Sequence, residues 1–193
     1  MIKEVAKRSF KNMVIESAYY RGIEISKEAL LMIEGVKPAY LQSYGKDFSK
    51  VTKRSKELDF LQAFYPTLNF PHRGNTRLIF RSASDLQKFV ATGARIVNEP
   101  ADPDNVVMDW HQEELGITLG YPPLAAHWFK NENRGAAHNE LTSINYHGIQ
   151  FCCAPSDADE CIKWMEDNRP VPEHLQTTVT QKKLGASKFK NKR

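Results

Sequence analysis

Residues 109–129, DWHQEELGITLGYPPLAAHWF, contain the strongest structural signal in this sequence. In the first half, apolar residues recur at helical spacing, and Gly120 stands where a helix end favours a left-handed residue. Pro122 opens the second half, at a position where a new helix tolerates a missing N–H. The stretch therefore predicts two short helices joined by a sharp corner.

A helix, a glycine corner and a second helix also form the layout of a helix-turn-helix motif. In a DNA-reading protein, the second helix offers polar side chains to base edges in the major groove. Here that helix begins with Pro122, Pro123 and Leu124, and its candidates for contacting a base are His127 and Asn131. This composition favours a helical hairpin packed in a core, with DNA reading as the alternative.

The corner also resembles the signature of a bacterial family of unknown function. Residues 114–116 (Glu-Leu-Gly) and 119–122 (Leu-Gly-Tyr-Pro) are similar to that family's Glu-Ile-Gly-x-x-Leu-Gly-Tyr-Pro box. The likeness extends loosely over residues 33–168. The chain departs from the family at Glu113, where a His often opens the box, and at Ala125, where an acidic residue is usual. The resemblance implies a protein of bacterial or bacteriophage type, and it brings no known activity.

Composition limits the class of protein. The chain has 193 residues, of which 41% are hydrophobic, and this is enough for one sizeable domain. No apolar run approaches the roughly 18 residues that span a bilayer, and the charged first 20 residues lack the apolar core of a signal peptide. Three cysteines, two of them adjacent, do not form a disulfide framework. We expect a cytoplasmic protein with reduced thiols and no membrane association.

Charge is distributed unevenly along the chain. Residues 1–95 hold 17 Lys/Arg and 9 Asp/Glu, whereas residues 96–181 hold 4 and 14. Residues 182–193 hold six Lys/Arg and no Asp/Glu. Two interpretations follow: a basic face meets an acidic partner, or the halves of the chain neutralise each other in the fold.

The first part of the chain is expected to be mainly helical. Apolar spacing predicts an amphipathic helix over residues 2–20, whose basic side could lie on a membrane or nucleic acid, or whose apolar side packs on its own domain. Ser26 is suited to cap a second helix over residues 27–33. Residues 40–46 have the composition of a turn and loop. A third helix is predicted over residues 48–64.

A strand followed by a capped helix is predicted twice. Residues 76–81 alternate as a strand, and Ser82 with Asp85 forms a capping box for a helix over residues 83–91. This order repeats later in the chain and indicates two strand-helix units that share one small sheet.

The second of these units lies near the C-terminus. Residues 144–153 are predicted to form one strand with a bulge at Gly148. Ser156 with Asp159 is the capping box for a helix over residues 157–168. A last helix over residues 173–183 and a disordered basic end complete the prediction.

Clustered basic residues indicate a site for an anion. Guanidinium groups suit phosphate and carboxylate oxygens, and basic tails neutralise phosphates without sequence preference. The alternative is that the arginines pair with the acidic residues of the 96–181 block. The candidate anion-binding residues are Arg73, Arg77, Arg81, Lys182, Lys183, Lys188 and Lys190.

Two other groups of residues suggest chemistry. A catalytic metal site needs about three converging ligands with one open position, and the candidates are His111, Glu114, His138 and His147. No HExxH spacing is present, and the alternative is that these histidines are scattered over the core and surface. Cys152 or Cys153 could also pair with a histidine as a nucleophile, although a strand cysteine is more often a small buried hydrophobe.

Together these patterns predict an α+β fold. We expect a mostly helical single domain over residues 1–181 around a small sheet, with a hinge near residues 96–105 and a flexible basic tail over residues 182–193. The favoured function is a small binding or regulatory protein that recognises an anionic partner, either nucleic acid or a nucleotide. The alternatives are a metal-dependent hydrolase and an inhibitor or sequestering protein that acts through a protein partner. The patterns identify no cofactor, pathway or oligomeric state.

Overall fold

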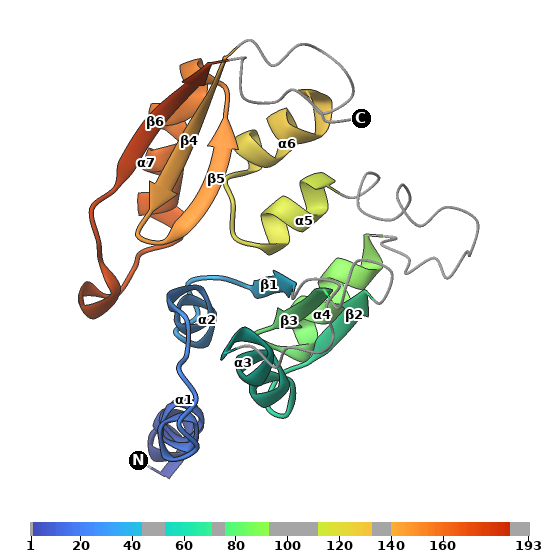
Figure 1. Cartoon of the computed structure of the whole chain (residues 1–193), viewed down its shortest axis with the longest axis vertical. Helices are drawn as coiled ribbons and strands as arrows, with labels where there is room; N and C mark the ends of the chain where they lie inside the picture. Colours follow the sequence, from blue (N-terminus) through green and yellow to red (C-terminus); the bar gives the residue numbers. More distant parts are fainter. Residues whose placement is uncertain (1, 44–52, 71–75, 93–111, 133–139, 186–193) are drawn as a thin grey trace. The chain divides into compact units, whose positions relative to one another are not determined.

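The computed structural model describes residues 2–43, 53–70, 76–92, 112–132 and 140–185 (Figure 1). The chain divides into two compact units, Met1–Lys88 and Phe89–Arg193. The described residues form seven α-helices and two antiparallel three-stranded sheets, which confirms the α+β class. The expectation of one shared sheet is wrong, because the two predicted strand-helix pairs contribute to different sheets. None of the described helices is long and apolar enough to cross a membrane.

The first unit packs helices around the sheet β1-β3-β2. Its core is formed by buried side chains from α1, α2, α3 and the sheet, including Val14, Met32, Leu58, Leu61 and Ile79. The elements, in chain order, are α1 (Ile2–Tyr20), α2 (Lys27–Ile33), β1 (Ala39–Ser43), α3 (Lys53–Gln62), β2 (Thr67–Phe70), β3 (Thr76–Phe80) and α4 (Ala83–Ala91), the last of which crosses the boundary between the units.

The helices α2 and α4 begin and end at the residues that the sequence predicts. The Ser26 hydroxyl accepts a hydrogen bond from Ala29 N at 3.3 Å and caps α2. The loop predicted over residues 40–46 is wrong in its described part, because Ala39–Ser43 is strand β1. This strand exists through its pairing with β3, and a short segment carries little sign of such a distant partner.

A buried carboxylate connects three elements of the first unit. Glu57 is 2% exposed, and one of its oxygens accepts a hydrogen bond from the backbone N–H of Ser26 at 2.7 Å. Its other oxygen accepts from the Tyr40 hydroxyl at 3.3 Å. Burial is the main cause that raises the pKa of Tyr40, so this hydroxyl stays a donor at neutral pH. Glu57 thereby fixes α3 to the start of α2 and to β1.

The second unit is built on the sheet β5-β4-β6, with α7 on one face (Figure 1). Cys161 and Met165 of α7 are fully buried, and the α6 helix packs beside β5. The elements are α5 (Gln112–Thr118), α6 (Pro123–Glu132), β4 (Glu140–Tyr146), β5 (Ile149–Cys153), a 3-10 turn (Pro155–Asp157), α7 (Ala158–Asn168), a second 3-10 turn (Glu173–Leu175) and β6 (Thr180–Gly185).

The single strand predicted over residues 144–153 is wrong, because a hairpin occupies this stretch. β4 and β5 pair antiparallel, and His147 and Gly148 between them have φ values of 51° and 102°. Two consecutive residues with positive φ are typical of the tight turn whose twist matches paired strands. The Asn145 side chain supports the turn by accepting a hydrogen bond from Gly148 N at 2.7 Å.

Two further predictions near the C-terminus are wrong. The helix expected over residues 173–183 is a 3-10 turn followed by strand β6, which pairs with β4. The β-branched residues at 177–180 favour this extended form, and pairing with β4 stabilises it. The capping box of Ser156 with Asp159 is also wrong, because the N-cap position of α7 is Asp157, which has no side-chain capping hydrogen bond. The Ser156 hydroxyl donates to the Asp157 carboxylate at 2.7 Å.

The central hairpin is confirmed as two helices that meet at Gly120. Gly120 has a φ of +88°, the left-handed conformation that ends α5. Tyr121 N donates to Gly116 O at 2.9 Å and closes the corner. A Cβ on Gly116 would lie 3.0 Å from the Ala126 Cβ, so the glycine allows α5 and α6 to approach closely. The predicted start of the first helix, before residue 112, lies outside the described residues.

Replacing Glu57 by alanine will remove the buried carboxylate that Ser26 N and the Tyr40 hydroxyl use as acceptor. We expect the free energy of unfolding to fall by about 1–3 kcal/mol, since buried donors lose their partner. Urea denaturation followed by circular dichroism measures this loss. Glu24→Ala is the matched control, because the Glu24 side chain is 74% exposed. Equal unfolding midpoints for the two variants would contradict the assignment.

Replacing Gly116 by valine will place a branched side chain against Ala126, where even a single Cβ is crowded. We expect a loss of about 1–3 kcal/mol in the free energy of unfolding, because the two helices must separate. Thermal unfolding followed by circular dichroism tests this. The control is Gly22→Ala, where no atom lies within 4 Å and the φ of +63° alone costs stability, about 1 kcal/mol. If the free energy of unfolding of Gly116→Val equals or exceeds that of Gly22→Ala, close packing of α5 on α6 is contradicted.

Candidate anion-binding surface

The predicted arginine cluster is divided by the structure. Arg73 lies outside the described residues, whereas Arg77 belongs to β3. One nitrogen of the Arg77 guanidinium lies 2.5 Å from a carboxylate oxygen of Asp59 on α3. The Arg77 side chain is only 20% exposed, so this ion pair lies against the body of the first unit.

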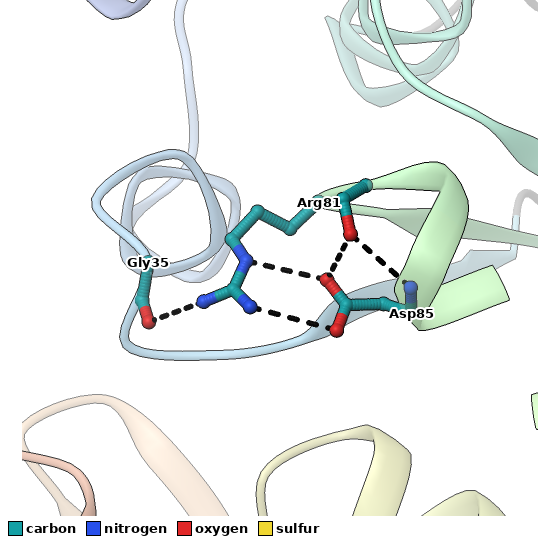
Figure 2. A network of polar contacts seen from close by, with 4 residues as sticks. Gly35, Arg81 and Asp85 are labelled. Atoms are coloured by element: carbon teal, nitrogen blue, oxygen red, sulfur yellow. Dashed lines mark hydrogen bonds and ion pairs between the residues drawn. The ribbon is translucent and has the colours of Figure 1, made fainter. Parts of the chain in front are cut away.

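Arg81, which follows β3 directly, forms a polar cluster with Gly35 and Asp85 (Figure 2). Its Nη1 donates to the Gly35 carbonyl oxygen at 3.0 Å, and its Nε lies 3.3 Å from Asp85 Oδ2. Asp85 also accepts from the Ser82 hydroxyl at 2.7 Å, while Asp85 N donates back to that hydroxyl at 3.1 Å. The Ser82 hydroxyl therefore caps α4 as predicted, and the Asp85 carboxylate bonds this hydroxyl. Arg81 connects this cap to the end of α2.

Arg77 and Arg81 thus each lie beside a carboxylate of their own unit. Asp59 and Asp85 belong to the basic first block of the sequence and not to the acidic block of residues 96–181. A phosphate at Arg77 or Arg81 would have to compete with an internal carboxylate at contact distance. These two residues stabilise the fold, and their predicted role in anion binding stays a prediction.

The lysines expected in a tail have a different setting. Lys182 and Lys183 lie in β6, where they stand opposite Ser143 and Thr142 of β4. Both lysine side chains are exposed. Lys188 and Lys190 lie outside the described residues. β6 is at the edge of the sheet. Because successive side chains of a strand point to opposite faces, Lys182 and Lys183 lie on different faces.

The two faces of this sheet differ in composition. Ile149, Phe151 and Cys153 of β5 are buried on the face that α7 covers. The alternate side chains of the three strands lie on the other face, called here the open face. It comprises Ser143 and Asn145 of β4, Gln150 and Cys152 of β5, and Thr180 and Lys182 of β6.

The register arranges the open face in two rows. Cys152, Ser143 and Lys182 form one row, and Gln150, Asn145 and Thr180 form the next. Gln150, Thr180 and Lys182 are exposed, while the three others are partly buried. Beyond the first row, Leu141 stands opposite Leu184 and is buried, so an apolar pair limits the polar area at that end.

The open face was not found from sequence. Its signal was present as alternation, because the residues of 149–153 and 180–184 that share this face are separated by one position. The predictions of one bulged strand over residues 144–153 and of one helix over residues 173–183 do not use this alternation. The pairing partner of each residue follows only from the observed register.

The described members of the predicted metal site do not form a ligand set. His111 and His138 lie outside the described residues, Glu114 lies in α5, and His147 lies in the β4-β5 turn. The Nδ1 atom of His147 lies 2.5 Å from Thr177 O and 3.1 Å from Thr177 N, so it contacts the backbone of the segment that precedes β6. Within the described ranges, no group of three His, Cys, Asp or Glu residues could hold a metal ion.

The three cysteines are free thiols. Cys153 and Cys161 are fully buried and hydrogen-bond each other, and this contact, with burial, raises the pKa of Cys153. The hydrogen bond with Cys153 lowers the pKa of Cys161, but Cys161 is 0% exposed and therefore out of reach of a substrate. Burial also raises the pKa of Cys152, although a hydrogen bond with Ser143 opposes the shift. A raised pKa lowers the thiolate fraction and makes a poor nucleophile.

The α5-α6 hairpin brings one additional pair together. Glu113 of α5 and His127 of α6 lie 3.2 Å apart, from carboxylate oxygen to ring nitrogen, on the surface. Glu113 stands where the resembled bacterial box often has a histidine. His127, a candidate for contacting a base, therefore pairs within its own hairpin, which supports the architectural interpretation of the corner.

Comparison with known proteins adds no relative. No protein-family model, curated protein or solved structure matches the chain. The likeness of the corner to the bacterial family box therefore stays a prediction.

Replacing Arg81 by methionine will remove the donor to Gly35 O and the partner of Asp85. We expect a loss of about 1 kcal/mol in the free energy of unfolding, because the exposed cluster is partly screened. Urea denaturation is the measurement, with Lys88→Met as control, because Lys88 is an exposed residue of α4, the helix that carries Asp85. A lysine at position 81 should restore little, because it lacks the guanidinium fork. Unchanged stability together with lost affinity for polyanions would instead assign Arg81 to ligand binding.

Proposed function

We propose that this protein is a small binding protein that recognises an anionic partner of the nucleic-acid or nucleotide class. The supporting observation is strand β6, which carries two consecutive exposed lysines on the edge of a sheet. The chain continues from β6 into residues 186–193, and residues 182–193 together hold six Lys/Arg and no Asp/Glu.

The physical basis of the proposal is counterion release. Each lysine or arginine that neutralises a phosphate releases a condensed cation, and the gain in entropy favours binding at low salt. An edge strand suits this role, because its side chains are not enclosed by a neighbouring strand. Lys182 and Lys183 have the same charge but point to opposite faces of the sheet. Substitutions at the two positions can therefore test which face contacts the ligand.

The alternatives have less support. A metal-dependent hydrolase lacks a converging ligand set within the described part of the chain. An inhibitor or sequestering protein would need a partner surface, and the acidic residues of the 96–181 block remain its candidate. We also propose the cytoplasm as the compartment, because the three cysteines are free thiols.

Binding to fluorescent single-stranded and duplex oligonucleotides, measured by anisotropy over a series of salt concentrations, tests the proposal. We expect binding at low salt whose affinity falls linearly with salt on a double-logarithmic plot. The double variant Lys182→Gln, Lys183→Gln should weaken binding roughly tenfold and make the salt slope shallower by up to about two.

The control is Lys53→Gln, Lys56→Gln, which removes the same charge from exposed positions of α3. This variant should retain most of the affinity if β6 is the contact surface. Absence of binding by the unmodified protein at the lowest salt would overturn the proposal. A loss that is equal in both double variants would show that net charge alone attracts the ligand.

A further inference from the structure

The open face of the β5-β4-β6 sheet carries a single positive charge. Its three strands hold one acidic residue, Glu140, and none of the six side chains of the open face is a carboxylate. Their one charged group is the Lys182 ammonium. A sheet with one solvated face is common, so openness alone does not indicate a site. The feature that suits an anionic ligand is a single cation among uncharged polar side chains.

We infer that the open face binds single-stranded nucleic acid, with Lys182 at a phosphate and the neighbouring amides and hydroxyls at sugars and base edges. This inference rests on the proposed function and specifies its surface and ligand. Ser143 and Thr180 offer hydroxyl groups, and Gln150 offers an amide that can both donate and accept hydrogen bonds. Asn145 offers its amide nitrogen as a donor, because its oxygen already accepts from Gly148 N. Such groups match the mixed donors and acceptors of unpaired nucleotides.

The shape of the surface favours a single strand over a duplex. Neighbouring strands lie about 4.8 Å apart, so three strands present a face about 10 Å wide. All six side chains of the open face come from strands, and the face offers no helix that could enter a major groove. A single strand can lie across such a face with its bases accessible to the amide groups.

The chemistry also sets the expected strength of binding. None of the six side chains of the open face is aromatic, so base stacking of about 1–3 kcal/mol per nucleotide is absent there. Contacts are limited to hydrogen bonds and one ion pair, which predicts modest affinity and a small contribution of Lys182 to the salt slope, close to one.

Lys182 and Lys183 provide a matched pair of positions. They are adjacent on the same edge strand, are both exposed, and stand opposite Ser143 on the open face and Thr142 on the covered face. Lys182→Glu and Lys183→Glu change the net charge of the protein equally. The inference predicts that Lys182→Glu weakens binding to a single-stranded oligonucleotide at least about fivefold more than Lys183→Glu.

A gain of charge tests the same face without removing a native side chain. Thr180→Lys places a second cation on the open face, whereas Gln181→Lys places it on the other side of β6. We expect only Thr180→Lys to tighten binding, and circular dichroism will show whether each variant retains its fold. If Lys182→Glu has the same effect as Lys183→Glu, and Thr180→Lys the same as Gln181→Lys, net charge explains the binding. This result would overturn the inference, while the proposed function would stand.

Cys152 supplies an independent readout. It is the thiol of the open face and is partly buried, whereas Cys153 and Cys161 are 0% exposed. Alkylation at mildly alkaline pH, followed by mass spectrometry, should therefore modify Cys152 first, and a single-stranded oligonucleotide should slow that reaction. Unchanged alkylation at a saturating oligonucleotide concentration would place the ligand elsewhere.

Competing ligands separate the remaining outcomes. A duplex of the same sequence and a free nucleoside triphosphate should protect Cys152 less than the single strand does. Stronger protection by either competitor would overturn the assignment to single strands. If no nucleic acid or nucleotide binds at low salt, the proposed function fails together with the inference.

Discussion

The position of β4 between β5 and β6 is the constraint on which the second unit depends. Side chains alternate along a strand, so a slip of one residue in either pairing would exchange the open and covered faces. The tight turn at His147 and Gly148 sets the register of β4 with β5, and burial of Ile144 and Phe151 on the covered face stabilises it. The same register places Lys182 beside Ser143, which makes a polar face with a single cation.

The first unit uses its charged residues differently. Glu57 is buried and accepts hydrogen bonds from Ser26 and Tyr40, so one carboxylate orients α2, β1 and α3. Arg77 and Arg81 each lie at a carboxylate of the same unit. These pairs are partly exposed and are screened by solvent, so each contributes little to stability, but a ligand at either arginine has to compete with its carboxylate. The basic excess of residues 1–95 therefore overstates the charge that is accessible to a ligand.

In both halves of the chain, the net charge of the sequence differs from the charge that a ligand could contact. The acidic block of residues 96–181 contains β4 and β5, whose side chains on the open face include no carboxylate. In the basic block of residues 1–95, Arg77 and Arg81 each lie beside a carboxylate of their own unit. Attraction at long range follows net charge, but recognition follows the groups that meet the ligand. This separation explains why the two lysines of β6 are a better candidate surface than the more numerous basic residues of the first unit.

The sequence by itself determined those helix ends and corners that depend on residues close to each other in the chain. Ser26, the box of Ser82 with Asp85, and Gly120 each act on their own helix end, and the sequence alone placed α2, α4 and the α5-α6 corner. Tertiary structure decided β1, β6 and the two faces of the β5-β4-β6 sheet, because a strand gains its hydrogen bonds from a partner that is distant in sequence. It also decided the candidate site: sequence supplied Lys182 and Lys183, and only the pairing with β4 separated them onto different faces.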